Sequence, residues 1–225
     1  MNKLIIDKLI QNIKETNLNK SSHWEKYLSD NSNYLDPFET FGFGAFTKNT
    51  LKNYIYNILA RIVFKNKIFK TQTYYAYKNI FDEIERYIDV DTIRHIFTFK
   101  KIKKHLNPKT ICIIGDGKLN GVLGANLTFP LAKIYSVNLS EVLINDYIIL
   151  EKTNTDMKKS VELVDDINFL TNDKILTLVP SNFKKFLLNK NIELFINIAS
   201  FQEMNEIEIN NYFEIIKNNK AKLYC

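Results

Sequence analysis

The spacing of apolar residues changes near Asn107-Pro108. Before that point, apolar side chains recur every three or four residues, as on one face of a helix, in the segments Leu4–Ile13, Leu51–Val63 and Tyr77–Ile88. A fourth helix is predicted to begin at Asp91, because aspartate suits the N-cap position. We therefore expect residues 1–107 to form an N-terminal helical region.

After Pro108, short apolar runs alternate with helical segments. Strands are predicted at Thr110–Ile114, Ile134–Val137, Ile175–Val179 and Leu194–Ile198, and a fifth apolar run opens at Leu223. Helices are predicted over about 119–127 and 207–216, in a segment capped by Ser140, and in a short segment after Ser181. Alternating helices and apolar strands favour an α/β fold with a Rossmann-like, doubly wound parallel sheet over residues 108–225.

Composition and residue spacing argue against a nucleic-acid partner, a metal site and a membrane span. The 225-residue chain has a net charge of +6, and its lysines are scattered. Because the sequence has no long basic tract, a nucleic-acid partner is not favoured. The two cysteines, Cys112 and Cys225, have no metal or disulfide spacing, and His23, His95 and His105 lie far apart, so no metal site is expected. No apolar stretch is long enough to span a membrane, and we expect a cytoplasmic protein.

The first predicted strand runs directly into Gly115-Asp116-Gly117, and Gly121 follows. In a doubly wound fold the ligand crevice lies at the carboxyl ends of the strands, and this first turn is its floor. Glycines allow a positive φ and a close backbone approach to a ligand. The spacing differs from the strict dinucleotide pattern, and a tight turn without a ligand remains an alternative.

Polar residues follow two further strands. Asn138 ends the second predicted strand, where nucleoside-binding folds usually place an acidic side chain on the ribose hydroxyls, and an asparagine amide can both donate and accept there. Ser136 and Glu141 are alternatives for this role. After the fourth strand come Asn197, Ser200, Gln202 and Glu203, of which Ser200, with Asn205 beyond it, could instead be an ordinary turn or cap residue.

These segments, in this order, resemble the sugar O-methyltransferase family. The resemblance covers about residues 92–225. Its most specific part is Ser200-Phe201-Gln202-Glu203-Met204. The other matching pieces are Ile114-Gly115-Asp116-Gly117, Asn120, Phe129-Pro130, Val137-Asn138-Leu139, Asn197-Ile198-Ala199 and Leu223-Tyr224-Cys225.

The resemblance implies an S-adenosylmethionine cofactor and methyl transfer to a hydroxyl of a small-molecule or glycan substrate, such as a surface polysaccharide. We take Glu203 as the general base, because no histidine occurs in that half of the chain. The N-terminal helices and the aromatic segment Tyr34–Phe46, with Phe38, Phe41 and Phe43, would shape the acceptor site. The residues expected at the cofactor are Gly115, Asp116, Gly117, Asn120, Asn138 and Ser200.

The chain departs from the wider methyltransferase pattern in three places. Ile113 and Asn138 stand where acidic residues are usual, and the sequence ends at the fifth strand. We therefore expect the final antiparallel strands of such sheets to be missing and the domain to be truncated at its C-terminus. Two alternatives remain open: an RNA methyltransferase, and a partial Rossmann domain with a structural role.

Overall fold

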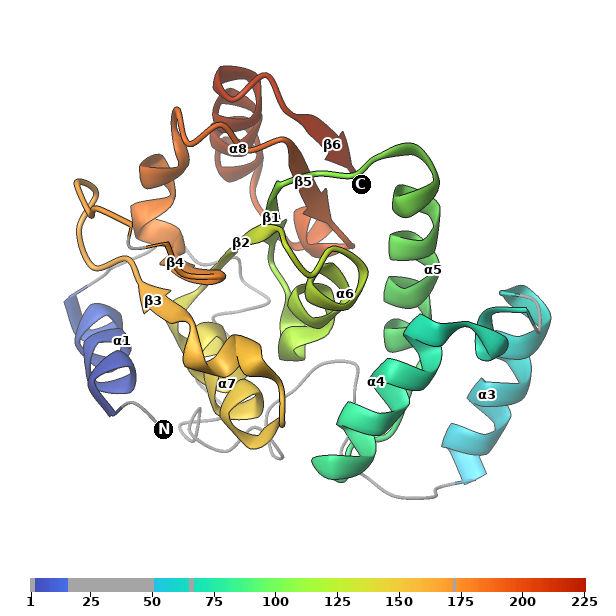
Figure 1. Cartoon of the computed structure of the whole chain (residues 1–225). Coiled ribbons are helices and arrows are strands. Elements are labelled where there is room, and N and C mark those ends of the chain that lie inside the picture. The colour runs from blue at the N-terminus through green and yellow to red at the C-terminus, as the bar shows by residue number, and fades with distance from the viewer. Residues whose placement is uncertain (1–2, 16–50, 65–66, 172) are drawn as a thin grey trace.

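The fold is organised around a six-stranded, all-parallel sheet. The computed structural model describes residues 3–15, 51–64, 67–171 and 173–225. The strands run in the spatial order β3-β4-β2-β1-β5-β6 (Figure 1). This arrangement confirms the predicted α/β class and the parallel sheet. The strands are β1 (Thr110–Ile114), β2 (Lys133–Asn138), β3 (Val161–Leu163), β4 (Leu176–Pro180), β5 (Leu194–Asn197) and β6 (Lys222–Tyr224).

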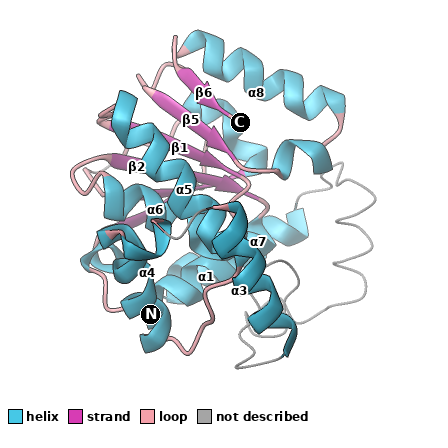
Figure 2. Ribbon diagram, turned by 90° about the vertical axis from the view of Figure 1, so that its right-hand side faces the viewer, coloured by secondary structure: helices cyan, strands magenta, loops and turns pink. Residues whose placement is uncertain are grey.

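Helices cover both faces of this sheet (Figure 2). Side chains alternate along a strand, so Ile111 and Ile113 of β1 face one hydrophobic cluster while Cys112 and Ile114 face the other. The second cluster is closed by α8 (Glu206–Asn218) and by the 3₁₀-helix Ser181–Leu187. The first is closed by α1 (Lys3–Glu15), α4 (Gln72–Glu83), α5 (Val90–His105), α6 (Asn120–Thr128) and α7 (Ser140–Lys152).

The N-terminal helices share a core with the sheet. Buried side chains of α1, α4 and α5, such as Leu9, Phe81 and Phe99, belong to the same cluster as Ile113 of β1. The sequence boundary at residues 107–108 coincides with the connection between α5 and β1. The hydrophobic core nevertheless continues across it, so folding of the sheet and of the N-terminal helices should be coupled.

Several predicted boundaries were wrong in detail. The N-cap of α5 is Asp89, whose carboxylate accepts from the Thr92 N–H, so Asp91 lies inside the first turn. The third predicted helix ends at Glu83 instead of Ile88. Ser140 is the first residue of α7 rather than its cap, and its hydroxyl donates to Asn12 Oδ1 of α1 over 2.8 Å.

The sequence analysis missed β3. This strand has only three residues, Val161–Leu163, and pairs in parallel with β4 at the edge of the sheet. So short a run carries too little alternation to be recognised. Ile198 lies just beyond β5, which ends at Asn197. The aromatic segment Tyr34–Phe46 lies outside the described residues.

Close packing between α5 and α6 depends on Gly124. A Cβ added there would lie 2.3 Å from the Phe99 ring and 2.5 Å from Tyr77 Oη, and both of these side chains are fully buried. We predict that Gly124→Ala lowers the free energy of unfolding by about 1–2 kcal/mol, because overpacking outweighs the better helix propensity of alanine. Urea denaturation measures this difference.

The matched control is Gly117→Ala, where a new Cβ has no atom within 4 Å. Its stability should stay within about 0.5 kcal/mol of the parent, as for most open positions. If the two variants unfold at the same urea concentration, the packing argument at Gly124 is wrong.

Candidate functional site

The topology puts the switch point of the sheet at the carboxyl ends of β1 and β5, and we call this expected ligand-binding region the crevice. From β1 the chain crosses to β2 on one side, and after β4 it returns to β5 on the other side of β1. The connecting helices change face at the same point, and ligands of doubly wound folds bind at such a switch point. The loops that flank it hold the predicted residues Gly115–Gly117 and Ser200–Glu203.

The backbone conformation at position 115 and the close approach of Ser200 both require a glycine there. Gly115 has φ +68, and its N–H donates to the Val137 carbonyl over 2.9 Å. A Cβ at this position would lie 2.2 Å from Ser200 Oγ. The Ser200 hydroxyl donates to the Ile114 carbonyl over 3.0 Å, and the Asn197 amide donates to both Ser200 Oγ and that carbonyl. The loop after β5 is thus fixed directly onto the end of β1.

Asp116 closes the N-terminus of α6. Its side chain is 2% exposed, and its two carboxylate oxygens accept from the Gly121 N–H (2.8 Å) and the Val122 N–H (2.7 Å). Burial raises the pKa of this carboxyl, an effect that the nearby His95 and the two N–H groups oppose. Both oxygens are therefore engaged within the loop.

Asn138 also braces this loop. At the end of β2, its Nδ2 donates to the Asp116 carbonyl over 2.7 Å, and its Oδ1 accepts from the Leu139 N–H over 3.0 Å. An asparagine amide has two N–H donors, so one N–H remains for a ligand. The alternatives are less open, because Ser136 is fully buried within β2 and Glu141 is buried in the first turn of α7.

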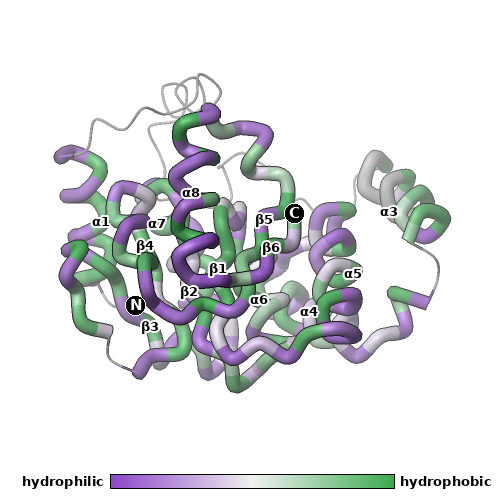
Figure 3. Tube along the Cα trace, turned by 90° about the horizontal axis from the view of Figure 1, so that it is seen from above, coloured by the Kyte–Doolittle hydropathy of each residue, from purple (hydrophilic) through white to green (hydrophobic). Residues whose placement is uncertain are grey.

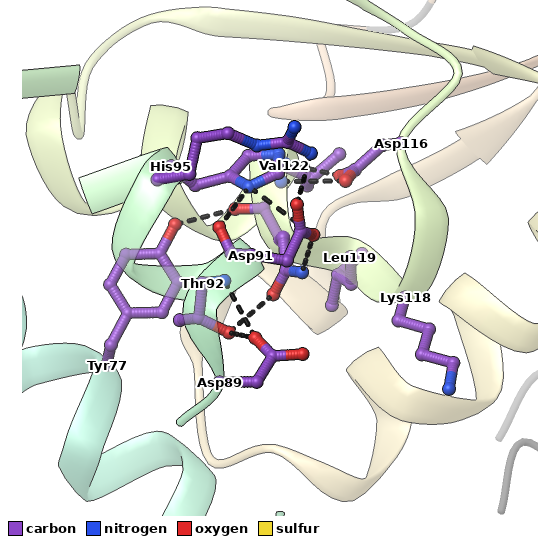
Figure 4. A network of polar contacts seen from close by, with 12 residues as sticks. Tyr77, Asp89, Asp91, Thr92, His95, Asp116, Lys118, Leu119 and Val122 are labelled. Atoms are coloured by element: carbon purple, nitrogen blue, oxygen red, sulfur yellow. Dashed lines mark hydrogen bonds and ion pairs between the residues drawn. The ribbon is translucent and has the colours of Figure 1, made fainter. Parts of the chain in front are cut away.

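Asn120 is fully buried, and its side chain takes part in a polar network with Asp91 and Thr92, which Figure 4 labels. Its Nδ2 donates to Asp91 over 2.9 Å, and its Oδ1 accepts from Arg86 Nη2 over 2.9 Å. Arg86 Nη1 donates to the Lys118 carbonyl over 2.6 Å, and Tyr77 donates to the Asn120 carbonyl over 2.6 Å. Residues of the N-terminal helical region thus hold the loop after β1 by hydrogen bonds to its backbone carbonyls.

The backbone of this loop is strained at two adjacent residues. Lys118 and Leu119 have φ values of 59° and 63°, and residues other than glycine rarely adopt this left-handed backbone conformation. The Leu119 N–H donates to Asp146 Oδ1 of α7 over 2.8 Å. Within the described part of the chain, Asp146 Oδ2 is buried without a hydrogen-bond partner. Burial raises the pKa of Asp146 well above its usual range, and the charge of Asp116 raises it further.

Lys118 adds a buried amine beside this loop. Its side chain is 5% exposed, and burial, together with the charge of Arg86, lowers its pKa to about 8. Sequence reasoning missed Arg86, Asp91 and Asp146 as parts of the site. The available signal was the polar pair Asn145-Asp146 within the otherwise apolar run Ile144–Leu150 of a helix.

Gly117 and Glu203 remain open toward solvent. A Cβ on Gly117 would meet no atom within 4 Å. Glu203 ends the 3₁₀-helix Ser200–Glu203 and is half-buried, and among the described residues it has no hydrogen-bond partner. The N-cap of α8 is Asn205, which accepts from the Glu208 N–H over 2.9 Å. Asn205, and not Glu203, therefore caps α8.

Comparisons with protein-family models, curated proteins and solved structures each gave no match. In the described ranges no group of three or more histidine, cysteine, aspartate or glutamate side chains could hold a metal ion. Nor is any described helix both long and apolar enough to cross a bilayer.

Asp146 gives a testable pH dependence. A carboxyl whose pKa is raised on folding stabilises the protein when protonated, and this contribution is lost as the pH rises through the raised pKa. In the variant Asp146→Asn, the amide cannot ionise but still provides an acceptor for the Leu119 N–H. We predict that this variant is more stable than the parent at pH 7, and that the difference disappears toward pH 4. Each unit of pKa shift corresponds to about 1.4 kcal/mol.

Urea denaturation between pH 4 and 8 measures this difference, and Asp156→Asn is the control. Asp156 is exposed and its pKa is lowered by Lys159, so its replacement should not stabilise the protein at pH 7. A parent and an Asp146→Asn variant with parallel pH profiles would show that folding does not raise the pKa of Asp146.

Proposed function

We propose that this chain binds S-adenosylmethionine in the crevice after β1 and transfers its methyl group to a hydroxyl, with a sugar as the acceptor class. The observation that carries the proposal is the carboxylate of Asp116 on the Gly121 and Val122 N–H groups. Dinucleotide-binding folds use the N-terminus of this helix for a pyrophosphate. Here a buried side chain already fills that position, which favours a nucleoside ligand without phosphates.

The crevice fits such a ligand in two further ways. The space over Gly117 is open, whereas Gly115 packs tightly on Ser200, so the chain can approach a ligand closely only along 116–117. The remaining N–H of Asn138 lies at the end of β2, where a ribose hydroxyl is bound in related architectures. In this proposal Asp116, Asn120 and Ser200 shape the loop, and the backbone provides most of the contact.

Glu203 is the proposed general base. When bound, S-adenosylmethionine supplies a methyl group on a sulfonium, and the acceptor oxygen must approach in line with the departing sulfur. A sugar hydroxyl is weakly acidic, so a carboxylate that removes its proton during attack accelerates transfer. Glu203 follows β5 at the switch point and is not held by another described side chain, as this role requires. The sugar itself is supported by the segment Ser200–Met204 and its family resemblance.

Cofactor binding can be tested by calorimetry. We predict that the protein binds S-adenosylhomocysteine more tightly than NAD. Gly117→Val should weaken S-adenosylhomocysteine binding at least about tenfold, which is 1.4 kcal/mol, because the added side chain occupies the open space. Gly117→Ala should have an intermediate effect, and circular dichroism should show that both variants stay folded. Tighter binding of NAD, or an unchanged Kd in Gly117→Val, would contradict the proposed cofactor.

Transfer can be tested with radiolabelled S-adenosylmethionine and a panel of sugars and nucleotide sugars. We predict that Glu203→Gln lowers kcat by a factor of about 10²–10⁴ and leaves the Kd for S-adenosylhomocysteine and the Tm unchanged. Glu206→Gln, an exposed carboxylate in the first turn of α8, is the matched control and should retain full activity. A Glu203→Gln enzyme with the parent's kcat would remove Glu203 from the mechanism.

A further inference from the structure

Acidic residues are distributed unevenly along the chain. Between residues 40 and 81 there are seven lysines or arginines and no aspartate or glutamate, whereas the remainder has 24 basic and 25 acidic residues. The whole net charge of +6 therefore comes from one segment. That segment contains α3 (Leu51–Val63), which lies at the edge of the molecule, beyond α4 and α5 as seen from the sheet (Figure 1).

The inward side of α3 is defined by a few contacts. Ala60 is buried, and the Phe64 ring just after the helix lies 5.7 Å from the Phe97 ring of α5. The Arg61 guanidinium stacks over the Phe69 ring at 4.4 Å. Because a helix has 3.6 residues per turn, positions 51, 55, 58 and 62 point away from Ala60.

Those outward positions are apolar instead of polar. Seven large side chains of α3 are between 44% and 77% exposed. They include the four outward positions and extend to the flanks of the helix, and together they are called the outward face: Leu51, Tyr54, Ile55, Ile58, Leu59, Ile62 and Val63. Figure 3 shows α3 standing apart from the body of the molecule, with much of its described length in the hydrophobic colour. A water-facing helix normally has the opposite pattern.

The size of the outward face indicates a binding surface. At about 150–200 Å² for each extended side chain, these exposed fractions amount to roughly 700 Å². Monomeric proteins rarely expose an apolar patch of more than a few hundred Å². Two exposed lysines, Lys67 and Lys70, follow α3 closely in the sequence.

We propose that the outward face of α3 lies in the interface of an anionic lipid bilayer. An interfacial helix inserts aliphatic and aromatic side chains about 5–10 Å deep while cations contact the headgroups. Each lysine near an anionic membrane adds about 1 kcal/mol, a fivefold gain in affinity. The absence of acidic residues from α3 suits this surface, because the helix itself then has no carboxylate that the headgroups would repel.

Other occupants suit the face less well. A second copy would bring two equally basic segments together, and like charges across an interface oppose association. Nucleic acids would use the cations, but six of the seven exposed side chains are aliphatic and cannot stack on bases as aromatic rings do. The inference is independent of the proposed methyl transfer, because vesicle binding requires neither cofactor nor acceptor.

Co-sedimentation with vesicles tests the proposal. The full chain should bind mixed phosphatidylcholine–phosphatidylglycerol vesicles, bind pure phosphatidylcholine much more weakly, and lose affinity as salt rises above about 0.1 M. Ile62→Ser should weaken binding at least about tenfold, since an apolar side chain no longer enters the interface. The double variant Lys67→Gln/Lys70→Gln should weaken it about 25-fold, fivefold for each charge.

Matched controls lie elsewhere on the molecule. Leu131→Ser removes an apolar side chain that is 98% exposed, and Lys217→Gln/Lys220→Gln removes two exposed charges at the end of α8. Both should bind vesicles like the parent, and all variants should keep the parent's Tm. Equal binding to neutral and anionic vesicles, equal losses in the controls, or no vesicle binding would overturn the proposal. So would a dimer that Ile62→Ser dissociates, because the face would then be covered by a second copy.

Discussion

The crevice depends above all on the buried carboxylate of Asp116. It accepts from the first free N–H groups of α6, and the backbone carbonyl of the same residue accepts from Asn138 at the end of β2. One residue therefore joins β1, β2 and α6. Its raised pKa reflects the cost of holding a carboxyl without water, and the helix N–H groups offset that cost. With the helix end already occupied by a carboxyl group, the site favours a ligand that does not carry a phosphate there.

The rest of the loop is held from outside the sheet. Lys118 and Leu119 have positive φ, a backbone conformation that such residues rarely adopt unless the surrounding structure holds them there. Arg86 binds the Lys118 carbonyl and Asp146 binds the Leu119 N–H. Arg86 comes from the connection between α4 and α5, while Asp146 comes from α7. The geometry of the crevice therefore requires the N-terminal helices, and this explains why one hydrophobic core runs through both parts of the chain.

The sequence predicted the fold better than the site. Long apolar periodicities identified α1, α3 and α8. The apolar runs at Thr110–Ile114 and Ile175–Val179 identified the interior strands β1 and β4, because strands buried on both faces have nearly continuous apolar sequences. The three-residue β3 was too short to stand out. The sequence placed the loops of the candidate site after β1 and β5, but it did not predict the direction of their polar side chains. That direction depends on partners such as Arg86 and Asp91, which lie far away along the chain.

Polar residues at strand ends serve two purposes that the sequence does not separate. Asn138, Ser200 and Asp116 stand where ligands are bound in doubly wound folds, yet each uses most of its hydrogen-bonding capacity on the backbone of a neighbouring loop. A loop fixed in this way presents its backbone and Gly117 to a ligand in one geometry, so less conformational entropy is lost on binding. It follows that chemical specificity must come from groups that are not committed to the scaffold. In the proposed mechanism that group is Glu203, in the loop after β5, which has no hydrogen-bond partner among the described residues.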